Sequence, residues 1–235
     1  MTHVFSVINQ KGGVGKSTLS INIACTLLQR GFKVLICDAD DQETSTACAS
    51  ISEHNESSFP DTVIIPKKND LHKVLAEHGA DYDFAIIDCP PSVKSDIPKI
   101  ALTMSDLAIV PFRPNAPDLW SGAKILNLIY EYSKENKDLN ACIIFNQVEG
   151  RIIQANKIAM QMLRDNHYDF PVLKTQIQMK NSFPISTAMG GAVHLYKRGR
   201  ASIDQINRAT DEILKLLKLP LRAKKSKKRK MLKKA

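Results

Sequence analysis

The 235-residue sequence lacks any apolar run of the roughly 18 residues that mark a membrane-spanning helix. Its first residues, Met1 to Phe5, carry no basic segment ahead of an apolar one, so we expect no secretory signal. The five cysteines are scattered and form no CxxC pair, which argues against a disulfide framework and against a tetrahedral zinc site. We therefore expect a cytoplasmic protein whose cysteines act as small buried hydrophobes.

An excess of one charge sign is also missing from most of the chain. The formal net charge is +9, and nine basic residues lie in the stretch from Arg222 to Ala235, which contains no Asp or Glu. Outside that stretch, 24 basic residues face 24 acidic ones. Because like charges at this density repel one another, we predict one globular domain over residues 1–219 and a basic tail over residues 220–235 that is disordered or folds only on a partner.

Hydrophobic patterning points to an α/β fold. Short β-branched apolar runs alternate with longer amphipathic stretches, which is typical of a parallel sheet wrapped by helices. We expect a single doubly wound, mostly parallel β-sheet with helices on both faces. The predicted strands are Val4–Ile8, Lys33–Cys37, Thr62–Ile65, Phe84–Ile87, Leu107–Val110, Ala141–Phe145 and Leu173–Ile177. The predicted helices are Ser17–Arg30, Asp70–His78, Asp96–Met104, Asp118–Asn136, Ile152–Asn166 and Ser202–Leu217.

The strongest motif runs from Gln10 to Thr18, directly after the first predicted strand and at the start of a predicted helix. Its glycines let the backbone turn tightly and aim successive N–H groups at phosphate oxygens, and the helix N-terminus adds favourable partial charge. Lys16 is expected to reach the terminal phosphates and the Ser17 hydroxyl to bind Mg²⁺. A glycine-rich turn that merely starts a helix would not need Lys and Ser in this register, so we interpret the segment as a phosphate-binding loop.

This loop resembles the deviant Walker A motif of the ParA/MinD superfamily of P-loop ATPases. The resemblance implies an enzyme that hydrolyses ATP with Mg²⁺ and forms a homodimer around the nucleotide. It also implies that Lys11 reaches across the dimer to the partner's nucleotide, where a cation could neutralise charge that develops during phosphoryl transfer. The residues that match the motif and are expected to bind nucleotide are Lys11, Gly12, Gly13, Val14, Gly15, Lys16, Ser17 and Thr18.

Two acidic segments also resemble motifs of this family. Asp38 and Asp40 follow a predicted strand, at the carboxyl end where open parallel sheets bind ligands. The resemblance implies that Asp38 lies beside the lysines and that Asp40 helps to activate the attacking water. Asp88 ends a strand that resembles Walker B, which implies that it holds Mg²⁺ through water. Asp41 departs from the usual Asp-Pro-Gln of the family, so neither the geometry of this loop nor the hydrolysis rate carries over.

The segment Pro111–Trp120 allows two interpretations. By resemblance to short ParA proteins it contributes to the dimer face. Alternatively, Asp118 is a helix N-cap and Trp120 packs on the core, since Asp is common at caps. The resemblance further suggests that Asn146, after a predicted strand, contacts adenine.

Basic clusters indicate non-specific DNA binding, because Lys and Arg neutralise phosphates without needing a fold. A membrane anchor would need a bulky apolar face, and the tail after Arg222 offers only Met231 and Leu232, so DNA is favoured over lipid. A solubilising tail and a solvated loop remain the alternatives. The candidate DNA-binding residues are Lys197, Arg198, Arg200, Arg222, Lys224, Lys225, Lys227, Lys228, Arg229 and Lys230.

Together these features suggest a ParA-like, nucleoid-associated ATPase that positions a plasmid, a chromosome or other large cargo, with hydrolysis stimulated by a ParB-like or other adaptor protein. With the loop so close to residue 1, we expect the short type without an N-terminal helix-turn-helix domain. A MinD-like membrane-associated ATPase and a metabolic ATPase on the same fold are the alternatives. An iron–sulfur protein is disfavoured because Cys89 has no evident mate, and a tyrosine kinase because the tail has no tyrosine.

Overall fold

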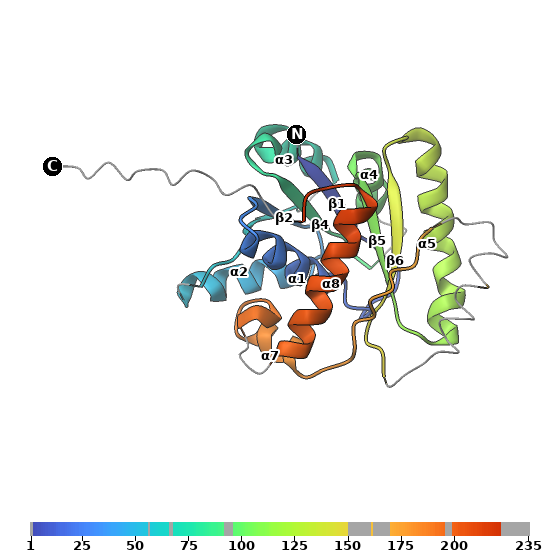
Figure 1. Cartoon of the computed structure of the whole chain (residues 1–235). Helices are drawn as coiled ribbons and strands as arrows, with labels where there is room; N and C mark the ends of the chain where they lie inside the picture. Colours follow the sequence, from blue (N-terminus) through green and yellow to red (C-terminus); the bar gives the residue numbers. More distant parts are fainter. Residues whose placement is uncertain are drawn as a thin grey trace.

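A computed structural model describes residues 2–55, 57–65, 68–91, 96–149, 161, 170–195 and 199–221. Its six strands form one parallel sheet with the order β3-β2-β4-β1-β5-β6 (Figure 1). This confirms the predicted α/β fold class, and each of the first six predicted strands is present to within two residues. The strands are β1 (His3–Val7), β2 (Val34–Asp38), β3 (Asp61–Ile64), β4 (Phe84–Asp88), β5 (Leu107–Phe112) and β6 (Asn140–Phe145).

Helices cover both faces of the sheet (Figure 1). Apolar side chains of α3, α4 and α5 pack on one face, and those of α1, α7 and α8 pack on the other. Strands such as β4 are buried along their whole length, which explains why they read as continuous apolar runs. The helices are α1 (Lys16–Gln29), α2 (Thr44–His54), α3 (Lys68–His78), α4 (Asp96–Met104), α5 (Ala116–Glu135), α7 (Ser182–Ala188) and α8 (Arg200–Leu216), with 3₁₀ turns η1 (Gly79–Asp81) and η2 (Val193–Leu195).

Strand order determines where ligands can bind. The chain builds outward from β1 through β2 to β3, returns to β4, and then crosses β1 to add β5 and β6. The winding direction therefore reverses around β1 and β4, whose carboxyl ends lie side by side. Open parallel sheets bind ligands at such a reversal, next to the carboxyl ends of the strands.

The prediction of a seventh strand over Leu173–Ile177 is wrong. This segment runs along β6 but contributes only isolated parallel bridges next to it, Ile143 with Val172 and Val148 with Gln178. The physical reason is a competing acceptor, because the carboxylate of Glu212 on α8 takes the backbone N–H groups of residues 174 and 175 at 2.6 and 3.0 Å. Backbone donors held by a side chain cannot also continue a strand ladder.

Two helices were not predicted. The α2 sequence is rich in Ser and Thr, which are poor helix formers, and α7 spans only seven residues with a proline inside. Packing stabilises both, since Cys48 of α2 is buried against α1 and Phe183 of α7 against the core. The predicted helix Ile152–Asn166 falls on residues outside the described ranges, apart from Gln161.

Candidate nucleotide site

The phosphate loop joins β1 to α1 at the carboxyl edge of the sheet, where the sequence motif predicts it. Gly13 and Gly15 have φ angles of 70° and 91°, in the left-handed region that side chains other than glycine disfavour. A Cβ atom on Gly15 would lie 2.2 Å from the amide nitrogen of Asn146. Both the backbone conformation and the space therefore require glycine at this position, directly before α1 begins at Lys16.

Lys16 is a buried cation, with 5% of its surface exposed. Its Nζ donates a hydrogen bond to the backbone carbonyl of Lys11 at 3.2 Å, so the ammonium lies inside the curve of the loop. Burial lowers the pKa of Lys16, while the negative charges of Asp88 and Asp40 act in the opposite direction. A desolvated ammonium enclosed by a glycine-rich loop is suited to an anion such as a nucleotide phosphate.

Asp88, at the end of β4, is completely buried among hydroxyl groups. Its carboxylate accepts hydrogen bonds from Ser20 Oγ at 3.2 Å and Ser45 Oγ at 3.0 Å. Burial raises the pKa of Asp88 to about 7, and the hydroxyls of Ser17, Ser45 and Ser20 counteract that rise. Carboxylate and hydroxyl oxygens are the ligands that Mg²⁺ prefers, so Ser17 and Asp88 together fit the predicted magnesium site.

Asp38 lies beside Asp88, because the two residues are register partners on adjacent strands. One carboxylate oxygen of Asp38 accepts hydrogen bonds from the backbone N–H and the hydroxyl of Thr46, at 2.8 and 2.9 Å. The other oxygen is buried and has no hydrogen-bond partner in the described part of the chain. A buried carboxylate oxygen without a partner is costly, so this atom is suited to bind a group that joins the site.

Asp40 lies near the start of the β2–α2 loop, half-buried, and its Oδ1 accepts a hydrogen bond from Gln42 N at 3.1 Å. It is close enough to Lys16 for its charge to raise the pKa of that lysine. Asp41, which replaces the usual proline of the family, is exposed, and Glu43 adopts a left-handed φ of 48° before α2 begins. Asp40 and Asp88 thus lie near Lys16 of the phosphate loop, and Asp38 lies beside Asp88 on the adjacent strand.

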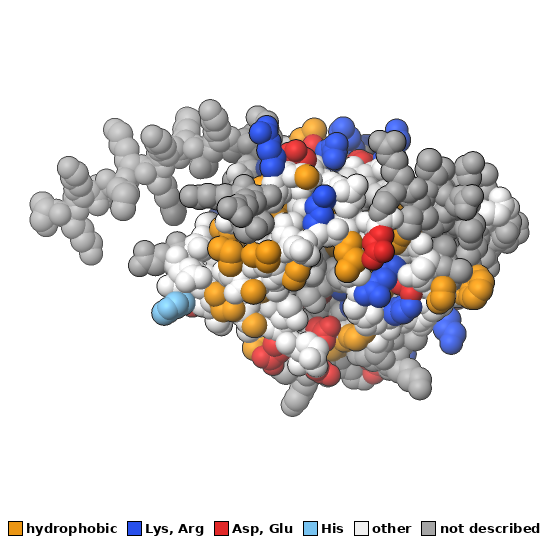
Figure 2. Space-filling model, turned by 90° about the horizontal axis from the view of Figure 1, so that it is seen from below, with side chains coloured by type: hydrophobic (Ala, Val, Ile, Leu, Met, Phe, Trp, Pro, Cys, Tyr) orange, Lys and Arg blue, Asp and Glu red, His pale blue; other side chains and the backbone are white. Residues whose placement is uncertain are grey.

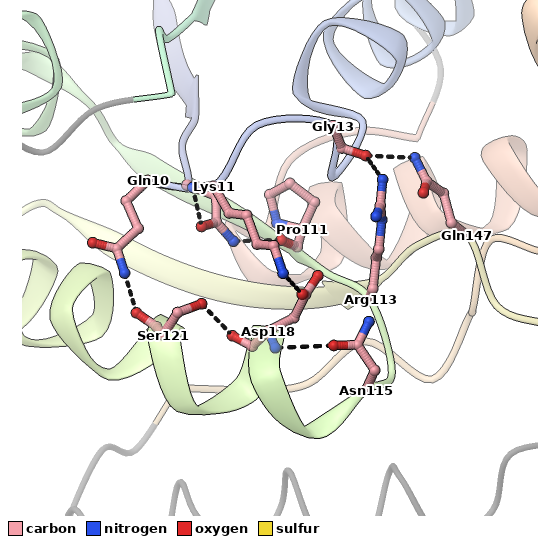
Figure 3. Close-up of polar contacts among 10 residues, drawn as sticks. Gln10, Lys11, Gly13, Pro111, Arg113, Asn115, Asp118, Ser121 and Gln147 are labelled. Carbon is pink, nitrogen blue, oxygen red and sulfur yellow. Dashed lines mark hydrogen bonds and ion pairs between the residues drawn. The ribbon is translucent and has the colours of Figure 1, made fainter.

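Lys11 forms an ion pair with Asp118 of α5 (Figure 3). Asp118 is not a helix cap. The cap of α5 is Asn115, whose Oδ1 accepts the N–H of Asp118 at 2.9 Å. Trp120 is 68% exposed rather than packed on the core. The interpretation of Asp118 as a cap and Trp120 as a core residue is therefore wrong. Asp118 faces the phosphate loop, and Trp120 faces solvent.

The loop is also held from the ends of β5 and β6, by Arg113 and Gln147, which were not predicted as site residues (Figure 3), and by Asn146, which was predicted to contact adenine. Arg113 donates a hydrogen bond to the carbonyl of Gly13, and Gln147 Nε2 donates to the same carbonyl at 2.9 Å. Asn146, which is 4% exposed, donates to the carbonyl of Val14 at 2.7 Å. A cation and an amide directly after apolar strands were the available signals, but sequence spacing does not reveal which loop they contact.

A cavity of about 680 Å³ opens next to the loop. Figure 2 looks onto this edge of the sheet and shows hydrophobic side chains gathered beside charged ones. Thr18 and Asn146 border the cavity on the side of the loop, and Met179 and Phe183 supply apolar walls. A largely apolar cavity beside a phosphate loop has the character of a nucleobase pocket.

Comparison with known proteins identifies the family. A family model described as an AAA domain matches residues 2–78 and 61–143. The Maintenance of carboxysome distribution protein A of Halothiobacillus neapolitanus is 31% identical over 211 residues, which cover 89% of this chain and 95% of that protein. The sporulation initiation inhibitor protein Soj of Bacillus subtilis is 28% identical over 177 residues, 59% of this chain and 70% of Soj. The chain belongs to the ParA/MinD superfamily of P-loop ATPases.

Solved structures agree with this assignment of the fold. The septum site-determining protein MinD of Pyrococcus horikoshii, complexed with Mg-ADP, superposes with a TM-score of 0.70 at 20% identity, covering 92% of this chain and 98% of MinD. At the level of the ParA/MinD family, this agrees with the predicted use of ATP and Mg²⁺. Within the described ranges, no helix combines the length and the apolar character that crossing a membrane requires.

The predicted DNA-binding residues of this ParA/MinD family member are only partly placed. Arg200 is the first residue of α8 and is exposed. Lys197, Arg198 and the basic residues of the tail lie outside the described residues.

Proposed function

We propose that this chain is a positioning ATPase, which dimerises on ATP, binds DNA non-specifically, and moves large cargo through partner-stimulated ATP hydrolysis. The observation that carries the proposal is the placement of Asp40 and Asp88 around the buried Lys16 of the phosphate loop, with Asp38 beside Asp88. Similarity along most of its length to a carboxysome distribution protein supports the positioning role.

Each residue at the site has a role that follows from its surroundings. Lys16 would hold a positive charge against the terminal phosphates. Ser17 and Asp88 would hold Mg²⁺, Asp88 through water, and the ion when bound would offset the negative charge of the phosphates. Asp40 would orient the attacking water, for which an acid near the phosphate side of Lys16 is well placed.

The nucleotide would extend from the phosphate loop into the 680 Å³ cavity, with its base among the apolar side chains and Asn146 at the entrance. The Asn146 amide nitrogen is already bonded to Val14, which leaves its carbonyl oxygen to accept from an exocyclic amine. Asp38 would stabilise the positive charge of the lysines at the site, and its carboxylate oxygen without a hydrogen-bond partner in the described residues supports such a role. Lys11 would cross to the nucleotide of a second subunit.

DNA binding would use the basic residues of the C-terminal region. The phosphate charges of DNA attract any dense cluster of Lys and Arg, so affinity would fall as salt rises. Nine basic residues without an acid in the tail, and the exposed Arg200 at the start of α8, support this surface. If ATP controls this basic surface, the protein would be nucleoid-associated in its DNA-binding state and free of the nucleoid in the other state.

The test is retention of the purified protein on duplex DNA of random sequence, with ATP or with ADP, at two salt concentrations. The intact chain is compared with a chain that ends at Leu221 and with Lys16→Ala, which removes the buried ammonium. We expect retention with ATP but not ADP, weaker at high salt, and absent for Lys16→Ala.

Other outcomes separate the parts of the proposal. If truncation abolishes retention, the tail is the contact, whereas unchanged retention assigns it to the region of Arg200. Retention that ignores the nucleotide would contradict the ATP-controlled switch. Absence of DNA retention combined with ATP-dependent binding to anionic liposomes would replace DNA by a membrane surface as the matrix.

A further inference from the structure

The ion pair between Lys11 and Asp118 joins the start of the phosphate loop to the first turn of α5 (Figure 3). Asp118 belongs to the first turn of α5, where the helix N-terminus favours a negative charge. Its side chain is only 2% exposed. Lys11 is its one ion-pair partner in the described part of the chain, and the second oxygen of Asp118 is buried there without any hydrogen bond.

Neighbouring contacts hold the backbone of Lys11 in the same orientation. Its N–H donates to Asn9 Oδ1 at 3.1 Å, and the amide nitrogen of Asn9 donates to the carbonyl of Pro111 at 2.7 Å. On the other side, the amide of Gln10 donates to the carbonyl of Ser121 on α5. The start of the loop is thus tied to the β5–α5 region at three separate points, and the ammonium of Lys11 points toward its own subunit.

This arrangement conflicts with a lysine that acts on a second subunit. The contact with Asp118, whose side chain is 2% exposed, holds the ammonium against its own subunit and away from a phosphate held by a partner. Leaving Asp118 would expose Lys11 for the partner but strand a buried carboxylate without its cation, which is unfavourable. The free subunit is therefore stabilised with Lys11 turned inward, and dimer formation must offset the loss of this pair.

We propose that Asp118 is a positioning residue that holds Lys11 on its own subunit until two ATP-bound subunits meet. The inference rests on the proposed function, because it assumes that ATP brings two copies together with Lys11 at the junction. It adds a restraint that opposes dimerisation and that ATP-dependent association has to overcome. Lys11 has two states, one paired with Asp118 and one released to the partner subunit. The ion pair biases this equilibrium toward the first state, so a stronger pair requires a higher protein concentration for dimerisation.

The experiment measures self-association of the full chain by sedimentation, over a range of protein concentrations, with a non-hydrolysable ATP analogue and Mg²⁺. Asp118→Asn keeps the shape of the side chain but removes its charge. We expect it to lower the protein concentration at half-dimerisation by roughly tenfold, a usual size for a coupled equilibrium. Asp118→Glu restores the charge and is expected to return the value toward that of the unmodified chain.

Two controls make the effect specific to the ion pair. Asp138→Asn makes the same charge change at an exposed position beyond the other end of α5 and should leave dimerisation unaltered. In a Lys11→Ala background there is no lysine to release, so adding Asp118→Asn should have no further effect. An equal shift in that background, or no shift in the unmodified background, would overturn the proposal.

A measurement on the unaltered protein covers the case in which Asp118→Asn does not fold. Modification of Lys11 by an amine-reactive reagent, followed by mass spectrometry, should be slower than that of the exposed Lys137 without nucleotide. Equal rates would overturn the proposal. Failure of the proposed function looks different, because the unmodified chain would then stay monomeric with the ATP analogue, whatever residue occupies position 118.

Discussion

The amide nitrogen of Asn146 lies 2.7 Å from the carbonyl oxygen of Val14, so the end of β6 is bonded directly to the phosphate loop. The two residues are 132 positions apart in the sequence. The contact leaves no space for a side chain on Gly15, since an added Cβ would meet that same nitrogen at 2.2 Å. The geometry of the loop therefore depends on a strand at the far side of the sheet.

Gly15→Ala should damage both stability and nucleotide binding. The left-handed φ of 91° and the contact with Asn146 each oppose a Cβ atom, and we expect a loss of about 1–3 kcal/mol in the free energy of unfolding. Urea denaturation without nucleotide measures it. Gly12→Ala is the matched control, because a Cβ there meets nothing within 4 Å. Equal losses for the two variants would contradict this account.

Asn146→Ala should weaken the connection between β6 and the loop. It removes one buried hydrogen bond and leaves the carbonyl of Val14 without that partner, which is expected to lower the free energy of unfolding by about 1–3 kcal/mol. ATP affinity, measured by calorimetry, should fall as well. Asn140→Ala, at the exposed opposite end of β6, should change neither quantity appreciably. A normal affinity for Asn146→Ala would separate this residue from the site.

Trp120 is the single tryptophan of the chain, and its 68% exposure predicts red-shifted emission that iodide or acrylamide quenches readily without nucleotide. Because no other tryptophan contributes, the fluorescence reports on the N-terminal part of α5 alone. Addition of the non-hydrolysable ATP analogue should reduce quenching if this face joins a second subunit. Blue-shifted emission that resists quenching in the free protein would contradict the exposed position.

His194 should make stability depend on pH away from the site. Burial lowers the pKa of His194 from its ordinary value of 6.5, while Nε2 contacts Asn207 Oδ1 at 3.4 Å. The unfolded chain therefore binds a proton that the folded chain resists. The contribution is fully present above about pH 6.5 and is lost as pH falls through the lowered pKa. Urea denaturation at pH 7.5 and pH 5 should show a smaller decrease for His194→Gln; an identical decrease would exclude His194 as the cause.

Local sequence was sufficient for the phosphate loop and for six strands. The run from Lys11 to Thr18 determines its own backbone conformation, since the positive φ angles at Gly13 and Gly15 are accessible mainly to glycine. Continuous apolar runs such as β4 can be satisfied only by burial on both faces. The acids Asp38, Asp40 and Asp88 follow such runs, so a parallel sheet brings them to one edge whatever the rest of the chain does.

Tertiary structure decided the pairings that local patterns do not encode. Glu212 converts an expected strand into a segment with isolated bridges, because it supplies acceptors from a helix that comes later in the chain. Lys11 meets Asp118 across 107 positions, and only the packing of α5 against β5, which pairs with β1, brings the two charges together. Residue type and spacing determine which backbone a segment can adopt, whereas the partner of a buried polar group depends on which distant element is folded against it.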